Sequence, residues 1–222
     1  MTLATDDGNA STKAQAPAPT QPVVVGIRRR TIDSVLIGIG VVAVAVLAVA
    51  GGLLTWGNNF ATDYVSDELT AQNIFFPDQA ALEEEGRTDL VKYAGEQVTT
   101  GDEAEAYASF IDGHLANIAD GATYAELGDP ESAARAAVQE ATANGASEEE
   151  ITALQAEADG VTAQRQSLFR GETLRGLLLS TFAWSTIGRI AGIAAMAAFV
   201  AAGMMLVLVA LGLVHHRKTV KS

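Results

Sequence analysis

Two long stretches of the chain carry no charged residue, 34–56 and 190–214. Each would cover ~35 Å as a helix, and the hydrocarbon core of a bilayer is ~30 Å thick. Lipid tails offer no hydrogen-bond partners to the backbone, and a continuous helix satisfies its own N–H and C=O groups. A chain of 222 residues is too short to bury two helices that are apolar on all sides. The pattern therefore predicts transmembrane helices at 31–56 and 190–214.

A third uncharged segment, 176–188, lies just before the second predicted span. Placing it in the membrane would put Arg189 at the bilayer centre, which costs at least ~3 kcal/mol. We therefore place Arg189 at the outer membrane boundary. Residues 176–189 are then expected to form an interfacial helix, with Phe182 and Trp184 near the depth of the headgroups.

The first span also contains Ala48-Val49-Ala50, which matches the pattern of a signal-peptidase site. The apolar run continues past this site and exceeds the ~7–15 residues of a signal peptide. An uncleaved anchor is therefore the expectation, with cleavage as the alternative.

Basic residues flank both predicted spans on the sides that lead to the chain ends. Short basic flanks stay in the cytoplasm, so both termini are expected there and the middle of the chain outside the plasma membrane. The charges agree, because residues 57–180 hold 24 acidic and 6 basic residues in a chain of net charge −13. Residues 1–30 are expected to form a disordered cytoplasmic tail, and residues 215–222 a basic one. The flanking residues are Arg28, Arg29, Arg30, Arg217 and Lys218.

The segment between the spans has the periodicity of helices and lacks the alternation typical of strands. Its clearest helix is predicted at 102–120. Asp129 followed by a proline predicts the start of another helix, and Ser147 opens a third with a capping box. Gly171 is expected to end that third helix. The chain is thus predicted to be all-α, with residues 57–175 forming a small extracytoplasmic helical bundle on two transmembrane helices. The helix that follows Asp129 is expected at 131–142 and short helices at 78–85 and 88–94, while residues 60–69 are expected to continue the first span outward.

The residues that carry most enzyme chemistry are scarce in the outer segment. The chain has no Cys, which excludes disulfides and thiolate sites, and His114 is the one histidine of the segment. His114 lies on the apolar face of its predicted helix, which favours a packed core histidine over a metal ligand. His215 and His216 belong to the basic flank. The acidic runs 83–85, 102–105 and 148–150 stand at helix ends, where solvated caps explain them better than a cation site. No catalytic residue, metal or cofactor is therefore expected.

Small residues form possible packing faces on both spans. They let membrane helices approach closely, which is how such helices associate. Three explanations stay open: ordinary use of Ala and Gly, pairing of the two spans, and contact with another membrane protein or a second copy. The residues are Gly38, Ala45, Ala48 and Gly52 on the first span, and Gly188, Gly192 and Ala195 at the second.

Four stretches carry a resemblance to known sequences: 61–65, 106–127, 168–178 and 183–191, of which LFRGETLRGLL at 168–178 is the most specific. They resemble a family of actinobacterial two-span membrane proteins with an acidic extracytoplasmic helical domain. The resemblance covers roughly residues 30–217 and implies the same topology, but no established activity. Some members are labelled aromatic ring-opening dioxygenases, which this sequence contradicts because the iron ligands of such an enzyme are missing.

Three arginines stand near the second span in an otherwise acidic region: Arg170, Arg175 and Arg189. They would pair either with phospholipid headgroups or with carboxylates of the same domain.

These features predict a non-enzymatic plasma-membrane protein, an accessory or scaffolding subunit of a membrane or envelope assembly. Its expected partners are the lipid bilayer and other membrane proteins or a second copy. A nucleic-acid partner is not expected, because the acidic balance offers no basic patch for phosphates. The alternative is an extracytoplasmic sensor or ligand-binding module that signals through a partner.

Overall fold

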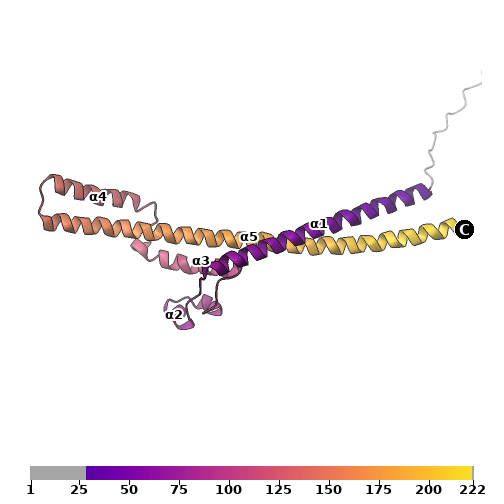
Figure 1. Ribbon diagram of the computed structural model, residues 1–222, viewed down its shortest axis with the longest axis horizontal. Helices are drawn as coiled ribbons and strands as arrows, with labels where there is room; N and C mark the ends of the chain where they lie inside the picture. Colours follow the sequence, from indigo (N-terminus) through magenta and orange to yellow (C-terminus); the bar gives the residue numbers. More distant parts are fainter. Residues whose placement is uncertain (1–28, 222) are drawn as a thin grey trace, which may run out of the picture.

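The computed structural model describes residues 29–221 as an all-α protein (Figure 1). Among these residues the β-structure is limited to an isolated bridge between Phe75 and Gln97. Helix α5 runs along the molecule, with α4 beside one end of it and α1 beside the other (Figure 1). The prediction of an all-α chain is confirmed. The predicted tail at 1–28, with Arg28, lies outside the described residues.

Helix α1 is Arg29–Gln72, 44 residues and ~66 Å long. It contains the first predicted span and continues outward beyond Trp56 without a break. It ends where Asn73 adopts a positive φ of 54°, shortly before Pro77. Both α1 and α5 contain a segment long and apolar enough to cross a membrane, which agrees with the two predicted spans.

Helix α5, Glu148–Lys221, is one helix of 74 residues, ~110 Å long. The predicted end at Gly171 is wrong, and the separate interfacial helix at 176–189 is part of α5. A glycine inside a helix costs only about 1 kcal/mol relative to alanine. At Gly171 a side chain would collide with Leu115 of α3, so this glycine is where α3 packs on α5. The long apolar and packed face outweighs the local penalty.

The outer elements begin and end largely where capping residues indicate. Asp78 accepts a hydrogen bond from the N–H of Ala81 (2.9 Å), and the Ser147 hydroxyl accepts one from Glu150 (3.2 Å). Thr100 forms a capping box with Glu103, which was not predicted from the sequence. The predicted cap at Asp129 is wrong, because α4 starts one residue earlier and Leu127 at its N-cap makes no side-chain bond. These elements are α2 Gln79–Glu84, η1 Thr88–Tyr93, α3 Gly101–Leu115, η2 Ile118–Gly121 and α4 Gly128–Ala143.

The outer helices lie in series along α5 rather than around one common core. α4 packs on the start of α5, α3 on its middle, and α1 on the rest. Three small clusters of buried side chains result. One joins α1, α3 and α5 around Val65, Ala108 and Leu178. The others centre on Leu82 with Phe110, and on Leu115 with Leu168. The prediction of a small helical bundle is therefore not confirmed, and the outer helices instead lie along α5 as along a rod.

Candidate functional site

The two spans pair through positions repeated every seven residues. On α1, Gly40, Leu47, Leu54 and Ala61 are buried or half-buried, and on α5 Ala195, Ala202 and Val209 are buried. A seven-residue repeat is typical of helices that pack with a left-handed supercoil. The remaining faces of both spans carry exposed large apolar side chains, as expected for surfaces that contact lipid.

Four glycines mark the closest approach of the two helices. A side chain at Gly40 would meet Val209, and one at Gly51 would meet the Phe199 ring. From α5, Gly188 faces Ala61 and Gly192 faces Asn58. Any larger residue at these positions would push α1 and α5 apart, so the glycines fix the separation of the pair. The contacts run antiparallel from Ala61, at the end near α3 that we call the outer end, to Gly40, at the end near the chain termini that we call the inner end.

The predicted packing residues fall on two different surfaces. Gly188, Gly192 and Ala195 lie on the side of α5 that packs against α1. Gly38, Ala45, Ala48 and Gly52 are exposed, and a Cβ atom added at Gly38 or Gly52 would have no neighbour within 4 Å. Gly38 and Gly40 are two residues apart and so point to opposite sides of a helix. The predicted seam on α1 therefore does not pair the spans, and its surface is open in the single chain.

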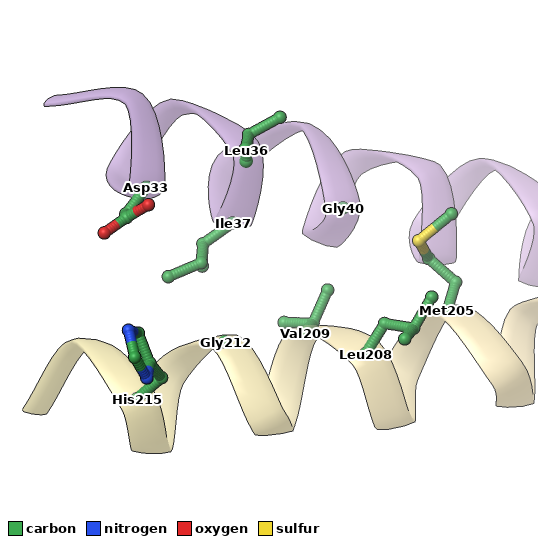
Figure 2. A pocket seen from close by; sticks show the side chains of 9 residues that line it. All are labelled: Asp33, Leu36, Ile37, Gly40, Met205, Leu208, Val209, Gly212 and His215. Carbon is green, nitrogen blue, oxygen red and sulfur yellow. The ribbon is translucent and has the colours of Figure 1, made fainter. Parts of the chain in front are cut away.

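A narrow apolar groove lies between the spans at their inner end (Figure 2). It encloses about 230 Å³ and is lined by Ile37, Gly40 and Val209. Asp33 and His215 point toward each other at its polar end (Figure 2). The groove thus places an acid and a histidine at the level where the basic flank begins.

Two further cavities meet at the outer end of the spans. The upper one, about 380 Å³, lies among α1, α3 and α5 and is rich in hydroxyl groups. The lower one, about 490 Å³, lies between α1 and α5 and is mostly apolar. Asn58 and Arg189 line both, so the two cavities are adjacent. The upper cavity is lined by Asn58, Thr62, Val65, Ser66, Thr99, Thr100, Gly101, Asp102, Ser185 and Arg189.

The three arginines near the second span divide between carboxylates and solvent. Arg189 pairs with Asp102 at 2.7 Å, and Arg175 pairs with Asp112 and Glu172, both at 3.2 Å. Two of the three arginines therefore pair with carboxylates, and the bonds to Asp102 and Asp112 tie α3 to α5. Arg170 is exposed and pairs with no carboxylate among residues 29–221.

A buried carboxylate fastens α4 to α5. Glu131, only 8% exposed, pairs with Arg135 at 2.7 Å and with Arg165 of α5 at 2.5 Å, and accepts a bond from the Thr162 hydroxyl at 2.9 Å. The Arg165 guanidinium, followed by the Thr162 hydroxyl, holds the pKa of Glu131 below its ordinary value. Arg165 also lies over the Tyr124 ring, 4.2 Å from its centroid. This cluster was not predicted from the sequence, since its members are distant along the chain and look like ordinary surface charges.

His114 is not the core histidine predicted from its helical face. Its side chain is 52% exposed, with Nε2 3.3 Å from Glu85 and its ring edge-on to Phe110. α3 buries Ala104, Ala108 and Leu115 instead, which leaves His114 at the rim. Within residues 29–221 no three His, Asp or Glu side chains lie close enough to hold a metal ion.

No protein-family model, curated protein or solved structure matches this chain. Function is therefore inferred from the geometry of the helices, cavities and ion pairs. The resemblance to an actinobacterial two-span family stays a prediction.

Proposed function

We propose that the protein is a non-enzymatic accessory or scaffolding subunit of a membrane or envelope assembly. The observation that carries this proposal is the unbroken α5, which extends from the spans to the far end of the outer domain. About 41 residues of α5 precede Arg189, which corresponds to a reach of ~60 Å above the proposed membrane boundary. Such a helix holds its far end at a fixed distance from the bilayer.

The surfaces of this rod support a role in binding other proteins. α4, α3 and α1 cover α5 in turn, and the faces of α4 and α5 that point outward carry mainly short and acidic side chains, including Glu140, Glu148 and Glu149. On the membrane side, the open small-residue surface of α1 around Gly38, Ala45 and Gly52 would accept another helix closely.

The proposed location is the plasma membrane, with both termini in the cytoplasm. The basic flanks support this orientation. An exposed aromatic ladder also supports the outer boundary: Trp56, Phe60 and Tyr64 stack with centroids 5.8 and 6.1 Å apart. Tryptophan and tyrosine concentrate at membrane interfaces. Arg189 and the half-exposed Trp184 lie near the same level, because Gly188 contacts Ala61.

Photo-cross-linking in native membranes tests the scaffold proposal. A photoreactive residue is introduced singly into the full chain at Ala45 on the open span surface, at Ala133 on the outside of α4, or at Ala202 inside the helix pair. We expect Ala45 or Ala133 to give defined adducts with one or a few membrane proteins or with a second copy, and Ala202 to give none. Purification in mild detergent should retain the same partners. A chain that gives no protein adduct from either exposed position, and is isolated only as a monomer, contradicts the proposal.

The continuity of α5 also favours a second candidate, an extracytoplasmic sensor. A rotation or shift of the outer part of α5 would reach His215 without crossing a hinge. A sensor is expected to show a ligand-dependent rise in the thermal unfolding temperature of the full chain, tested with panels of amino acids, sugars and divalent cations. It is also expected to change disulfide formation between cysteines placed at Ile37 and Gly212, which face each other across the pair.

A further inference from the structure

The two adjacent cavities at the outer end of the spans differ in polarity, the upper one being the more polar. Below Arg189, the lower cavity is lined mainly by apolar groups, including Ile193, Met196 and Phe199. Above it, the upper cavity is lined by five Ser and Thr residues together with apolar groups, and the hydroxyls of Thr99 and Thr100 already bond to Glu103. The five residues are Thr62, Ser66, Thr99, Thr100 and Ser185. Asn58 and Arg189 stand at the junction between them.

We propose that these cavities bind one phospholipid of the outer leaflet, with a zwitterionic headgroup that carries a primary amine. Its acyl chain lies in the lower cavity against Met196 and Phe199. Its phosphate accepts hydrogen bonds from Arg189 and Asn58 at the junction. Its ammonium group reaches Asp102 in the upper cavity.

The depth of the site fits a lipid. Arg189 lies at the proposed outer boundary, where phosphates of the leaflet are found, and the lower cavity lies between the two spans. Hydrocarbon in the lower cavity covers apolar side chains, whereas water there would leave them exposed. A phosphate at the guanidinium forms charge-assisted hydrogen bonds, which are about twice as strong as neutral ones.

The charges of the site favour a zwitterion over an anion. Among the described residues, Arg189 and Asp102 are the only formally charged groups that line the two cavities, and they pair through one nitrogen and one oxygen. Both side chains stay about half exposed, at 53% and 57%, so each can accept a second partner. A phosphate supplies the second partner of the Arg189 guanidinium, and an ammonium group supplies the second partner of the Asp102 carboxylate. An anionic headgroup would meet Asp102 and the acidic outer domain with no cation of its own.

Native mass spectrometry of the full chain tests this proposal. The protein in mild detergent is titrated with phosphatidylethanolamine, phosphatidylglycerol or phosphatidylcholine of identical acyl chains. We expect one phosphatidylethanolamine to bind most tightly. Arg189→Gln is expected to weaken that binding about tenfold, the effect of removing a charge-assisted hydrogen bond. Arg170→Gln removes the same charge from an exposed position on the same helix and is expected to change nothing.

A second variant keeps the test informative if Arg189→Gln disturbs the docking of α3. Asp102→Asn preserves the shape of the side chain and removes only its charge. We expect this variant to lose the preference for phosphatidylethanolamine over phosphatidylglycerol, while circular dichroism shows the same helix content and unfolding temperature within a few degrees. Equal affinity for all three lipids in the unmodified chain overturns the proposal. So does an unchanged preference in Asp102→Asn, or an equal loss in Arg170→Gln. The scaffold proposal is unaffected by these outcomes, since it depends on protein adducts.

Discussion

At the scale of single residues, small side chains have meaning only relative to the face they occupy. Gly38 and Gly40 are near neighbours in an apolar run, yet only Gly40 meets the partner helix. A Cβ atom at Gly40 would approach the Val209 side chain to 2.5 Å, while one at Gly38 would meet no atom within 4 Å. The pair of glycines therefore provides a matched comparison of packed and open positions.

Gly40→Leu is expected to destabilise the helix pair by about 1–3 kcal/mol, because overpacking forces the backbones apart. The matched variant Gly38→Leu should cost little in the isolated chain. Unfolding in mixed micelles of increasing denaturing detergent, followed by circular dichroism, measures both. A larger loss for Gly38→Leu than for Gly40→Leu would show that another pair of faces holds the spans together.

Glu131 predicts a pH dependence of the outer domain. Its pKa is lower in the folded chain than in the unfolded one, where it is near 4.5. The contribution of ionised Glu131 to the free energy of unfolding is therefore complete above that pH. It disappears as the pH falls through the pKa that Glu131 has in the folded chain. The unfolding temperature of the outer part should drop on acidification from pH 6 to about 3.

Glu131→Gln is expected to lower the unfolding temperature at pH 7 and to flatten this pH dependence, because it removes the charge that Arg135 and Arg165 share. Glu140→Gln, at an exposed position of the same helix, serves as the control. The role assigned to Glu131 fails if both variants show the same pH profile as the original chain.

At the scale of elements, the helices were more predictable than their relations. The sequence pattern located α2, η1 and α4 to within a few residues, although the cap predicted for α4 was wrong. Gly86, Gly95 and Gly145 end elements with φ values of 73°, 73° and 71°. The continuity of α5 was missed, because the penalty of Gly171 is local while the packing of Leu115 into its place is tertiary. The sequence predicts that Arg189 can pair with a carboxylate, but it does not show which one. The partner is Asp102, 87 residues away, and only the tertiary packing of α3 on α5 brings the two together.

The continuity of α5 is itself measurable. The chain has no Cys, so spin labels attach only at cysteines introduced at Glu149 and Gly176, both exposed. A straight helix places them ~40 Å apart, and we expect one narrow distance peak by pulsed electron paramagnetic resonance. Gly160→Pro in the same labelled chain should shorten and broaden the distribution, since proline breaks a helix interior. A broad distribution in the chain without proline would restore the break expected at Gly171.

At the scale of the whole molecule, the proposed topology places the two ends of the rod in different compartments. A membrane-impermeant maleimide is expected to label Ala133→Cys on intact cells and Ser222→Cys only in inside-out vesicles. The reverse pattern would place the acidic segment in the cytoplasm, and the basic flanks would then have failed as a guide to orientation. The same two variants, labelled after detergent solubilisation, show that both cysteines react when no bilayer separates them from the reagent.

A single unhinged helix also couples rotation to length. Each residue of an α-helix turns the chain by about 100°. One residue inserted into α5 between Gly176 and Gly188 would rotate α4, which the ion pair of Glu131 with Arg165 holds on α5, to another direction about the axis of α5. Seven inserted residues would bring α4 nearly back to its first azimuth and lift it by ~10 Å. The number of residues in α5 therefore sets both the axial position of α4 and its rotation about the helix axis, and neither can change without the other.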